Sequence, residues 1–178
     1  MVKFQSNKNQ FVFTFAKNFL GISLWIPALL FIEQHIFSVG SIDGRSMKPT
    51  LNPETNFLKR DKVLVWKWNK NFERGDVVIL RSPEDPQRLL VKRVLAIEDD
   101  LVKTRPPKST RFVPIPEGHV WVEGDEQFHS IDSNQFGPVS TGLITAKIIA
   151  IVFPFSRMRR ITNDDMRKDA LVINTNFD

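Results

Sequence analysis

The sequence predicts a mainly β domain that follows a single N-terminal transmembrane helix. Two observations lead to this prediction. An uncharged apolar run, Phe19–Ile32, lies near the start of the chain, and short segments rich in Val, Ile and Trp recur between residues 62 and 153. A chain of 178 residues is long enough to bury one core, so we expect one folded domain with a small appendage.

The composition excludes several kinds of site. The chain has no cysteine, which rules out a thiol nucleophile, a thiolate metal site and a disulfide framework. Lys and Arg number 25 against 20 Asp and Glu, which gives a net charge of +5. This basic balance suits nucleic acid, an anionic membrane surface or an acidic partner, and does not choose among them. We predict neither a cofactor nor a metal.

Residues 1–38 are interpreted as a basic flank and a membrane anchor. Met1–Ile32 contains three lysines and no Asp or Glu. The uncharged stretch Asn18–Ile32 would extend roughly 22 Å as a helix, less than the ~30 Å hydrocarbon core, so its length favours a buried soluble helix. Its apolar side chains surround the helix on all sides, however, and Phe11–Ala16 could extend it. We therefore predict one membrane span.

The lysines also predict the orientation of the anchor. Because positive charge is retained on the side of synthesis, the N-terminus should stay there and everything after His35 should lie across the membrane. A cleaved secretory signal is the alternative, although residues 38–46 offer no clear small-x-small cleavage site.

The predicted domain, residues 39–156, consists of short β-strands with polar or Pro-rich connectors. Residues 157–178 are predicted to form a tail that is first basic and then polar. The expected strands, each bounded by Gly, Pro, Asp or Asn, are Lys62–Trp68, Asp76–Arg81, Arg88–Ile97, His119–Gly124 and Leu143–Phe153.

Ser46 stands in the stretch Gly44–Leu51, GRSMKPTL, soon after the apolar segment. Ser, Pro and Thr are ordinary turn residues, so this stretch could be a simple loop. A serine becomes a nucleophile only when a base takes its proton. A histidine base is conceivable at His119 or His129, which have Asp125 and Asp132 nearby in the sequence.

A desolvated lysine is the other neutral base that a protein can make, because burial disfavours the ammonium form. Lys92 and Arg93 both lie in an apolar strand, and Lys147 lies in another. Arginine is excluded as a base because its guanidinium group is not deprotonated in proteins. The residue pattern alone leaves the choice between Lys92 and Lys147 open.

Four boxes in order resemble the type I signal peptidases, membrane-anchored serine proteases that use a Ser–Lys dyad. Ser46–Leu51 resembles the S-M-x-P-T-L box of that family. The other boxes are Arg74–Val78, Val91–Val94, and Gly124–Asp125 with Ser130–Ser133 and Phe136–Val139. The resemblance implies the β fold that signal peptidases share with LexA-type repressors. It also implies that Ser46 is the nucleophile and Lys92 the general base, whereas Lys147 matches no family position.

The supporting positions match less evenly. Ser130 matches a serine that orients the lysine amine in bacterial relatives. Gly44 stands where some bacterial members carry a serine that donates to the oxyanion, so the hole is expected to use the Ser46 N–H with a backbone N–H or water. Asp132 matches an Asp that pairs with an Arg two residues later. That residue is Asn134 here, so Asp132 should need another hydrogen-bonded partner.

Within the family, the chain is most similar to the mitochondrial inner membrane proteases. The resemblance implies an endopeptidase that faces the intermembrane space, works as a heterodimer with a homologous catalytic subunit, and removes sorting sequences from precursor proteins delivered there. The alternatives are a bacterial-type leader peptidase and a non-catalytic, membrane-tethered β module. A self-cleaving LexA-type repressor and a nucleic-acid-binding β barrel are less favoured, and we predict no nucleic-acid partner.

Overall fold

The computed structural model describes residues 14, 17–19, 21, 23–53, 60–68, 71–105, 111–126, 128, 130–162 and 172–174. The chain divides into two compact units, Met1–Ile36 and Phe37–Asp178. The candidate site lies entirely in the second unit.

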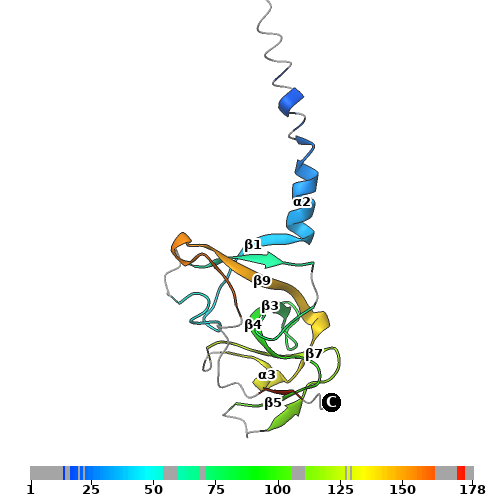
Figure 1. Cartoon of the computed structure of the whole chain (residues 1–178), viewed down its shortest axis with the longest axis vertical. Coiled ribbons are helices and arrows are strands. Elements are labelled where there is room, and N and C mark those ends of the chain that lie inside the picture. Colours follow the sequence, from blue (N-terminus) through cyan, green and yellow to red (C-terminus); the bar gives the residue numbers. More distant parts are fainter. Residues whose placement is uncertain are drawn as a thin grey trace, which may run out of the picture. The chain divides into compact units, whose positions relative to one another are not determined.

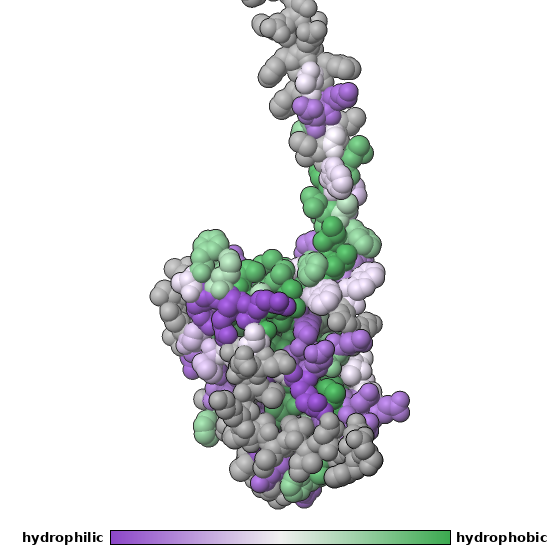
Figure 2. Space-filling model, in the orientation of Figure 1, coloured by the Kyte–Doolittle hydropathy of each residue, from purple (hydrophilic) through white to green (hydrophobic). Residues whose placement is uncertain are grey.

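The first unit contains helix α2, Ile26–His35 (Figure 1). Pro27 lies in its first turn, where the missing N–H costs no intrahelical hydrogen bond. None of its side chains is buried, and Figure 2 shows hydrophobic side chains along it. Within the described residues, no helix is both long enough and apolar enough to cross a membrane. The membrane span therefore stays a prediction.

The second unit is built on an antiparallel sheet of eight strands among the described residues. Strand β9 lies between β2 and β3, and Figure 1 shows it, in gold, running along the domain. The strands follow the order β1-β2-β9-β3-β4-β7-β8, with β10 paired to β9. Their bounds are β1 Phe37–Ser41, β2 Lys62–Trp66, β3 Val77–Arg81, β4 Leu89–Ala96, β7 His119–Glu123, β8 Val139–Ser140, β9 Ile144–Phe153 and β10 Arg159–Arg160.

A smaller sheet and three short helices complete the described part of this unit. The sheet has the order β11-β5-β6, so a segment near the C-terminus pairs with the middle of the chain. The strand bounds are β5 Asp100–Lys103, β6 Phe112–Pro114 and β11 Val172–Asn174; the helices are α3 Ser133–Phe136, η2 Thr141–Leu143 and η3 Phe155–Arg157.

The central strands are covered on both faces. Successive side chains of a strand point to opposite faces, yet Val77 and Val78 are both fully buried, in two different apolar clusters. In β4, Val94 packs in the second cluster while Leu95 packs in a third, around Trp121. Charged side chains on either face of β4 are consequently removed from water.

The structure confirms the mainly β prediction and all five predicted strands, with ends that differ by at most two residues. It adds β1, β5, β6, β8, β10 and β11. These strands are short, and each is defined by its pairing with another strand. The partner lies far away in the sequence for β1, β8 and β11, and closer for the β5–β6 and β9–β10 pairs.

Candidate active site

Ser46 lies in the turn that follows β1, and apolar anchors fix this turn. Met47 and Leu51 are 2% and 1% exposed and pack into the first apolar cluster. The Leu51 N–H donates to the Met47 carbonyl at 2.8 Å. Because its neighbour Met47 is drawn into the core, Ser46 is held half-buried at the surface of the domain.

Buried polar groups tie the far end of the same turn to β2. The Asn52 side chain donates to the Ile42 carbonyl at 2.6 Å and accepts from the Asp61 N–H at 2.8 Å. The Asn52 N–H donates to the Asp61 carboxylate at 2.8 Å. Arg157 donates to both oxygens of Asp61 at 2.6 Å. These bonds leave the turn that carries Ser46 little freedom.

Lys92 extends from β4 into an apolar environment. Its same-face neighbours are Leu90 and Val94, and Lys92 is only 2% exposed. Its Nζ donates to Ser130 Oγ at 2.9 Å. Burial lowers the pKa of Lys92 from 10.5 to about 8; Asp132 and Asp125 act against this change, while Arg88 and Arg105 reinforce it. A large fraction of the amine is therefore neutral near pH 8.

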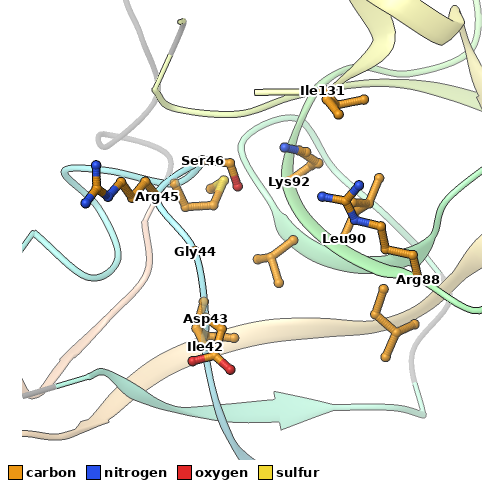
Figure 3. A pocket seen from close by; sticks show the side chains of 12 residues that line it. Ile42, Asp43, Gly44, Arg45, Ser46, Arg88, Leu90, Lys92 and Ile131 are labelled. Atoms are coloured by element: carbon orange, nitrogen blue, oxygen red, sulfur yellow. The ribbon is translucent and has the colours of Figure 1, made fainter. Parts of the chain in front are cut away.

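Ser46 and Lys92 line one pocket, with a cavity volume of about 210 Å³. Figure 3 shows the Ser46 hydroxyl and the Lys92 amine pointing toward one another, whereas the Arg45 side chain points away. The remaining lining residues are Ile42, Asp43, Gly44, Met47, Arg88, Leu89, Leu90, Val91 and Ile131. An extended peptide that entered this pocket would meet several apolar side chains, together with the hydroxyl of Ser46 and the amine of Lys92.

Gly124 brings the end of β7 against both partners of the site. A Cβ at this position would lie 2.3 Å from Ser130 Oγ and 2.5 Å from the Ser46 carbonyl oxygen. The next segment is pinned to the same carbonyl, because the Glu126 N–H donates to it at 3.0 Å. Only glycine permits this approach. The sequence identified Gly124 as part of a family box but did not predict this packing role.

Gly44 lines the pocket with a φ of 103°. This is the left-handed region, which favours glycine over a residue with a side chain. Hence the backbone conformation at Gly44 gives a local reason for glycine at the position where some bacterial relatives carry a serine.

Asp132 has the hydrogen-bonded partners that the loss of an Arg at position 134 was expected to require. It caps helix α3, accepting from the Asn134 N–H at 3.1 Å, and accepts from the Gly124 N–H at 3.1 Å. An arginine is also present: Arg105 Nη2 lies 3.4 Å from Asp132 Oδ2. This arginine comes from the segment after β5, and sequence reasoning missed it.

The other candidate bases lie in different surroundings. Lys147 forms an ion pair with Asp76, Nζ to Oδ1 2.6 Å. Arg93 donates to both oxygens of Asp125 at 2.9 Å and to the Gly75 carbonyl at 2.8 Å. His119 Nδ1 lies 2.9 Å from the Glu117 carbonyl, and His119 does not line the pocket that holds Ser46. His129 lies outside the described residues.

Comparison with known proteins shows which family this chain matches. The family model described as signal peptidase, peptidase S26 matches residues 15–110. The mitochondrial inner membrane protease subunit 2 of Schizosaccharomyces pombe is 68% identical over 93% of this chain and 93% of its own. Subunit 1 from the same organism is 40% identical over 75% of this chain and 85% of its own.

A crystal structure of a signal peptidase I from Enterococcus faecalis V583 is a remote likeness. It is 18% identical, has a TM-score of 0.39, and the match covers 43% of this chain and 96% of that one. The family match and the close relatives identify the chain without it: this protein belongs to the signal peptidase family, peptidase S26, and is a serine protease of the type I signal peptidase kind.

Proposed function

We propose that this chain is a membrane-anchored endopeptidase of the mitochondrial inner membrane, which removes sorting sequences from proteins delivered to the intermembrane space. Ser46 is its nucleophile and Lys92 its general base. One observation supports this mechanism above the others. The Lys92 amine is buried, held by Ser130, and directed into the same pocket as the Ser46 hydroxyl.

In the acylation step, neutral Lys92 takes the proton of the Ser46 hydroxyl while Ser46 Oγ bonds to the scissile carbonyl carbon. Because Lys92 donates one N–H to Ser130, its lone pair can be directed at Ser46. The Ser46 N–H supplies a donor for the oxyanion. As the C–N bond breaks, the Lys92 ammonium returns the proton to the leaving amine.

Deacylation reverses the proton transfers. Neutral Lys92 takes a proton from water, the resulting hydroxide attacks the acyl carbon, and the ester bond to Ser46 breaks. The proton then returns to Ser46 Oγ, which restores the free hydroxyl and the neutral amine. One buried lysine therefore serves as base and acid in both halves of the reaction.

The location and the partner are inferred from relatives. The names of the Schizosaccharomyces pombe relatives place them in the mitochondrial inner membrane and number them as subunits 1 and 2. We infer that this chain works there as a single-pass protein, with its protease domain in the intermembrane space and a homologous catalytic subunit as its heterodimer partner. Its substrates are precursors with cleavable sorting sequences.

The decisive experiment compares two cations at position 92. Arginine keeps the charge and much of the packing of lysine but cannot give up its proton. Lys92→Arg and Ser46→Ala should each lower kcat/KM on a precursor by at least ~10³-fold, and the double variant should be little worse than either, because both belong to one catalytic unit. Wild-type kcat/KM should rise with pH through a midpoint near pH 8, the pKa of Lys92.

Lys147→Arg is the matched control, because Lys147 is already ion-paired with Asp76 and arginine preserves that pair. We expect it to cleave normally. A Lys92→Arg enzyme that kept a tenth or more of wild-type turnover would show that lysine is not the base. All variants are assayed as the full chain, co-purified in detergent with its partner subunit.

A further inference from the structure

Asp132 is connected to Lys92 through a series of contacts, although it does not line the pocket itself. It is 3% exposed, and its Oδ2 accepts from the Gly124 N–H at 3.1 Å. Gly124 in turn packs directly against Ser130 and the Ser46 carbonyl, and Ser130 accepts from Lys92. A displacement of Asp132 would therefore move Gly124 and Ser130, and Ser130 is the residue that orients the Lys92 amine.

Arg105 is placed to hold Asp132. Its side chain is 14% exposed and forms ion pairs with Asp132, at 3.4 Å, and with Glu123. Its backbone N–H also donates to Asn134 Oδ1 at 2.9 Å. The Asn134 amide completes the cluster by donating to Asp132 at 3.0 Å and to Glu123 at 2.8 Å.

Arg105 acts as a counter-ion for two buried carboxylates in this cluster. Glu123 and Asp132 are both buried carboxylates, 5% and 3% exposed. Asn134 and Trp121 give them neutral hydrogen bonds, the latter from Nε1 to Glu123 at 2.9 Å, and Arg105 forms an ion pair with each of them. A buried charge left without its counter-ion is strongly unfavourable.

The charges that act on Lys92 come from several segments. Arg88 precedes β4, Asp125 and Asp132 follow β7, and Arg105 follows β5. Asp125 forms a bidentate pair with Arg93 and still raises the pKa of Lys92. From β9, the register places Lys147 across Val78 from Lys92, and its pair with Asp76 neutralises it. Asp132 raises the pKa of Lys92, and Arg105 lowers it.

We propose that Arg105 is a positioning residue of the Ser46–Lys92 site, acting through its ion pair with Asp132. It takes the place of the arginine that position 134 lacks, from a position 27 residues before Asp132. The inference rests on the proposed function of Lys92 as general base. Arg105 itself does not line the pocket.

The test is the pH profile of kcat/KM for Arg105→Gln in the full chain with its partner subunit. Removing the guanidinium leaves the carboxylate of Asp132 uncompensated, which favours the ammonium form of Lys92. The acidic limb should move to higher pH by about one unit, a roughly tenfold loss at pH 7 that recovers in alkaline solution. Arg105→Lys keeps the charge and should leave the limb in place.

Asp132→Asn should shift the acidic limb in the opposite direction. It also tests the proposal if Arg105→Gln does not fold. It removes the negative charge that favours the ammonium form, so its acidic limb should move to lower pH. In the double variant, Arg105→Gln with Asp132→Asn, the two shifts should largely cancel. Merely structural damage would lower activity at every pH and would not produce shifts of opposite sign.

Arg74→Gln is the matched control. Arg74 also pairs with a buried carboxylate, forming a bidentate pair with Asp100 at 2.6 and 2.7 Å, but it is not among the charges that act on Lys92. It should lower the Tm without moving the acidic limb. The proposal is overturned if folded Arg105→Gln keeps the wild-type limb, if Asp132→Asn leaves it unmoved, or if Arg74→Gln moves it equally.

The failure of the proposed function would look different. If Lys92 were not the base, Lys92→Arg would stay active and the limb could not be assigned to Lys92. If only the inference about Arg105 were wrong, Lys92→Arg would be inactive and the wild-type limb would persist unmoved in the Arg105 variants.

Discussion

Gly124 is the residue at which the strand end, the nucleophile turn and the lysine support meet. A methyl group there would lie 2.5 Å from the Ser46 carbonyl oxygen, which is backbone and cannot rotate away, and 2.3 Å from Ser130 Oγ. Gly124→Ala should therefore push β7 from the Ser46 turn and move Ser130 from Lys92. We expect a loss of ~10²-fold or more in kcat, because misplacements of about 1 Å cost this much.

The measurement is single-turnover cleavage, together with the Tm as a check of folding. Gly142→Ala is the matched control, since the nearest atom to its new methyl group would be Ser140 Oγ at 3.5 Å, an ordinary contact. Full activity in Gly124→Ala would contradict the close packing on which the site is built.

For single residues, the sequence predicted the chemical type of the base better than it predicted the residues around that base. The residue pattern favoured a desolvated lysine but left Lys92 and Lys147 open, and the family resemblance selected Lys92, whose pKa is lowered by burial to about 8. The pattern could not separate Lys92 from Arg93, because both faces of β4 are buried. Arg105 could not be predicted at all. Its carboxylate partners, Glu123 and Asp132, become neighbours only when β7 and the segment after β5 fold together.

Helix η3 shows how a short element far along the chain can stabilise the nucleophile turn. Arg157, its last residue, donates to both oxygens of Asp61 at 2.6 Å and to the Thr50 carbonyl at 3.1 Å. Asp61 is fully buried. Arg157→Ala would leave that charge without its counter-ion, so we expect about 3–5 kcal/mol lower unfolding free energy. Urea unfolding of the full chain in detergent measures it.

Arg60→Ala is the control for this prediction. Arg60 also pairs with an aspartate, Asp43, but that pair is exposed, and exposed pairs contribute at most about 1 kcal/mol. Equal losses for Arg157→Ala and Arg60→Ala would show that the buried pair does not hold the turn.

Strands β1 and β10 mark a limit of what the sequence could predict about the elements. The five predicted strands are dense in Val, Ile and Leu, so their local pattern was sufficient. Strand β1, FSVGS, contains Gly and two Ser and forms through its five paired residues with β2. Strand β10, Arg159–Arg160, has no apolar residue and forms by pairing with β9. Such strands depend on tertiary pairing.

On the scale of the whole molecule, the chain combines a β protease domain with an N-terminal segment whose charges are all positive up to Ile32. The domain begins with β1 at Phe37, directly after the segment that contains α2. Ser46 is therefore only 14 residues beyond Ile32 in the sequence. If the segment is the anchor that we propose, the nucleophile is tethered close to the membrane surface, where a sorting sequence would emerge from the bilayer.

The tether can be tested in isolated mitochondria. With the outer membrane opened and the inner membrane intact, added protease should degrade the C-terminal domain, and carbonate should not extract the protein. Replacing Leu24 and Ile26, near the middle of the uncharged stretch Asn18–Ile32, with Arg should make the protein extractable, since each charge costs about 2.5–3.5 kcal/mol at the centre of a span. Leu89→Arg, a change at an exposed leucine of the protease domain, is the control and should stay in the membrane. Full carbonate extraction of the wild-type chain would exclude the anchor, and protection of the domain from protease would reverse the proposed orientation.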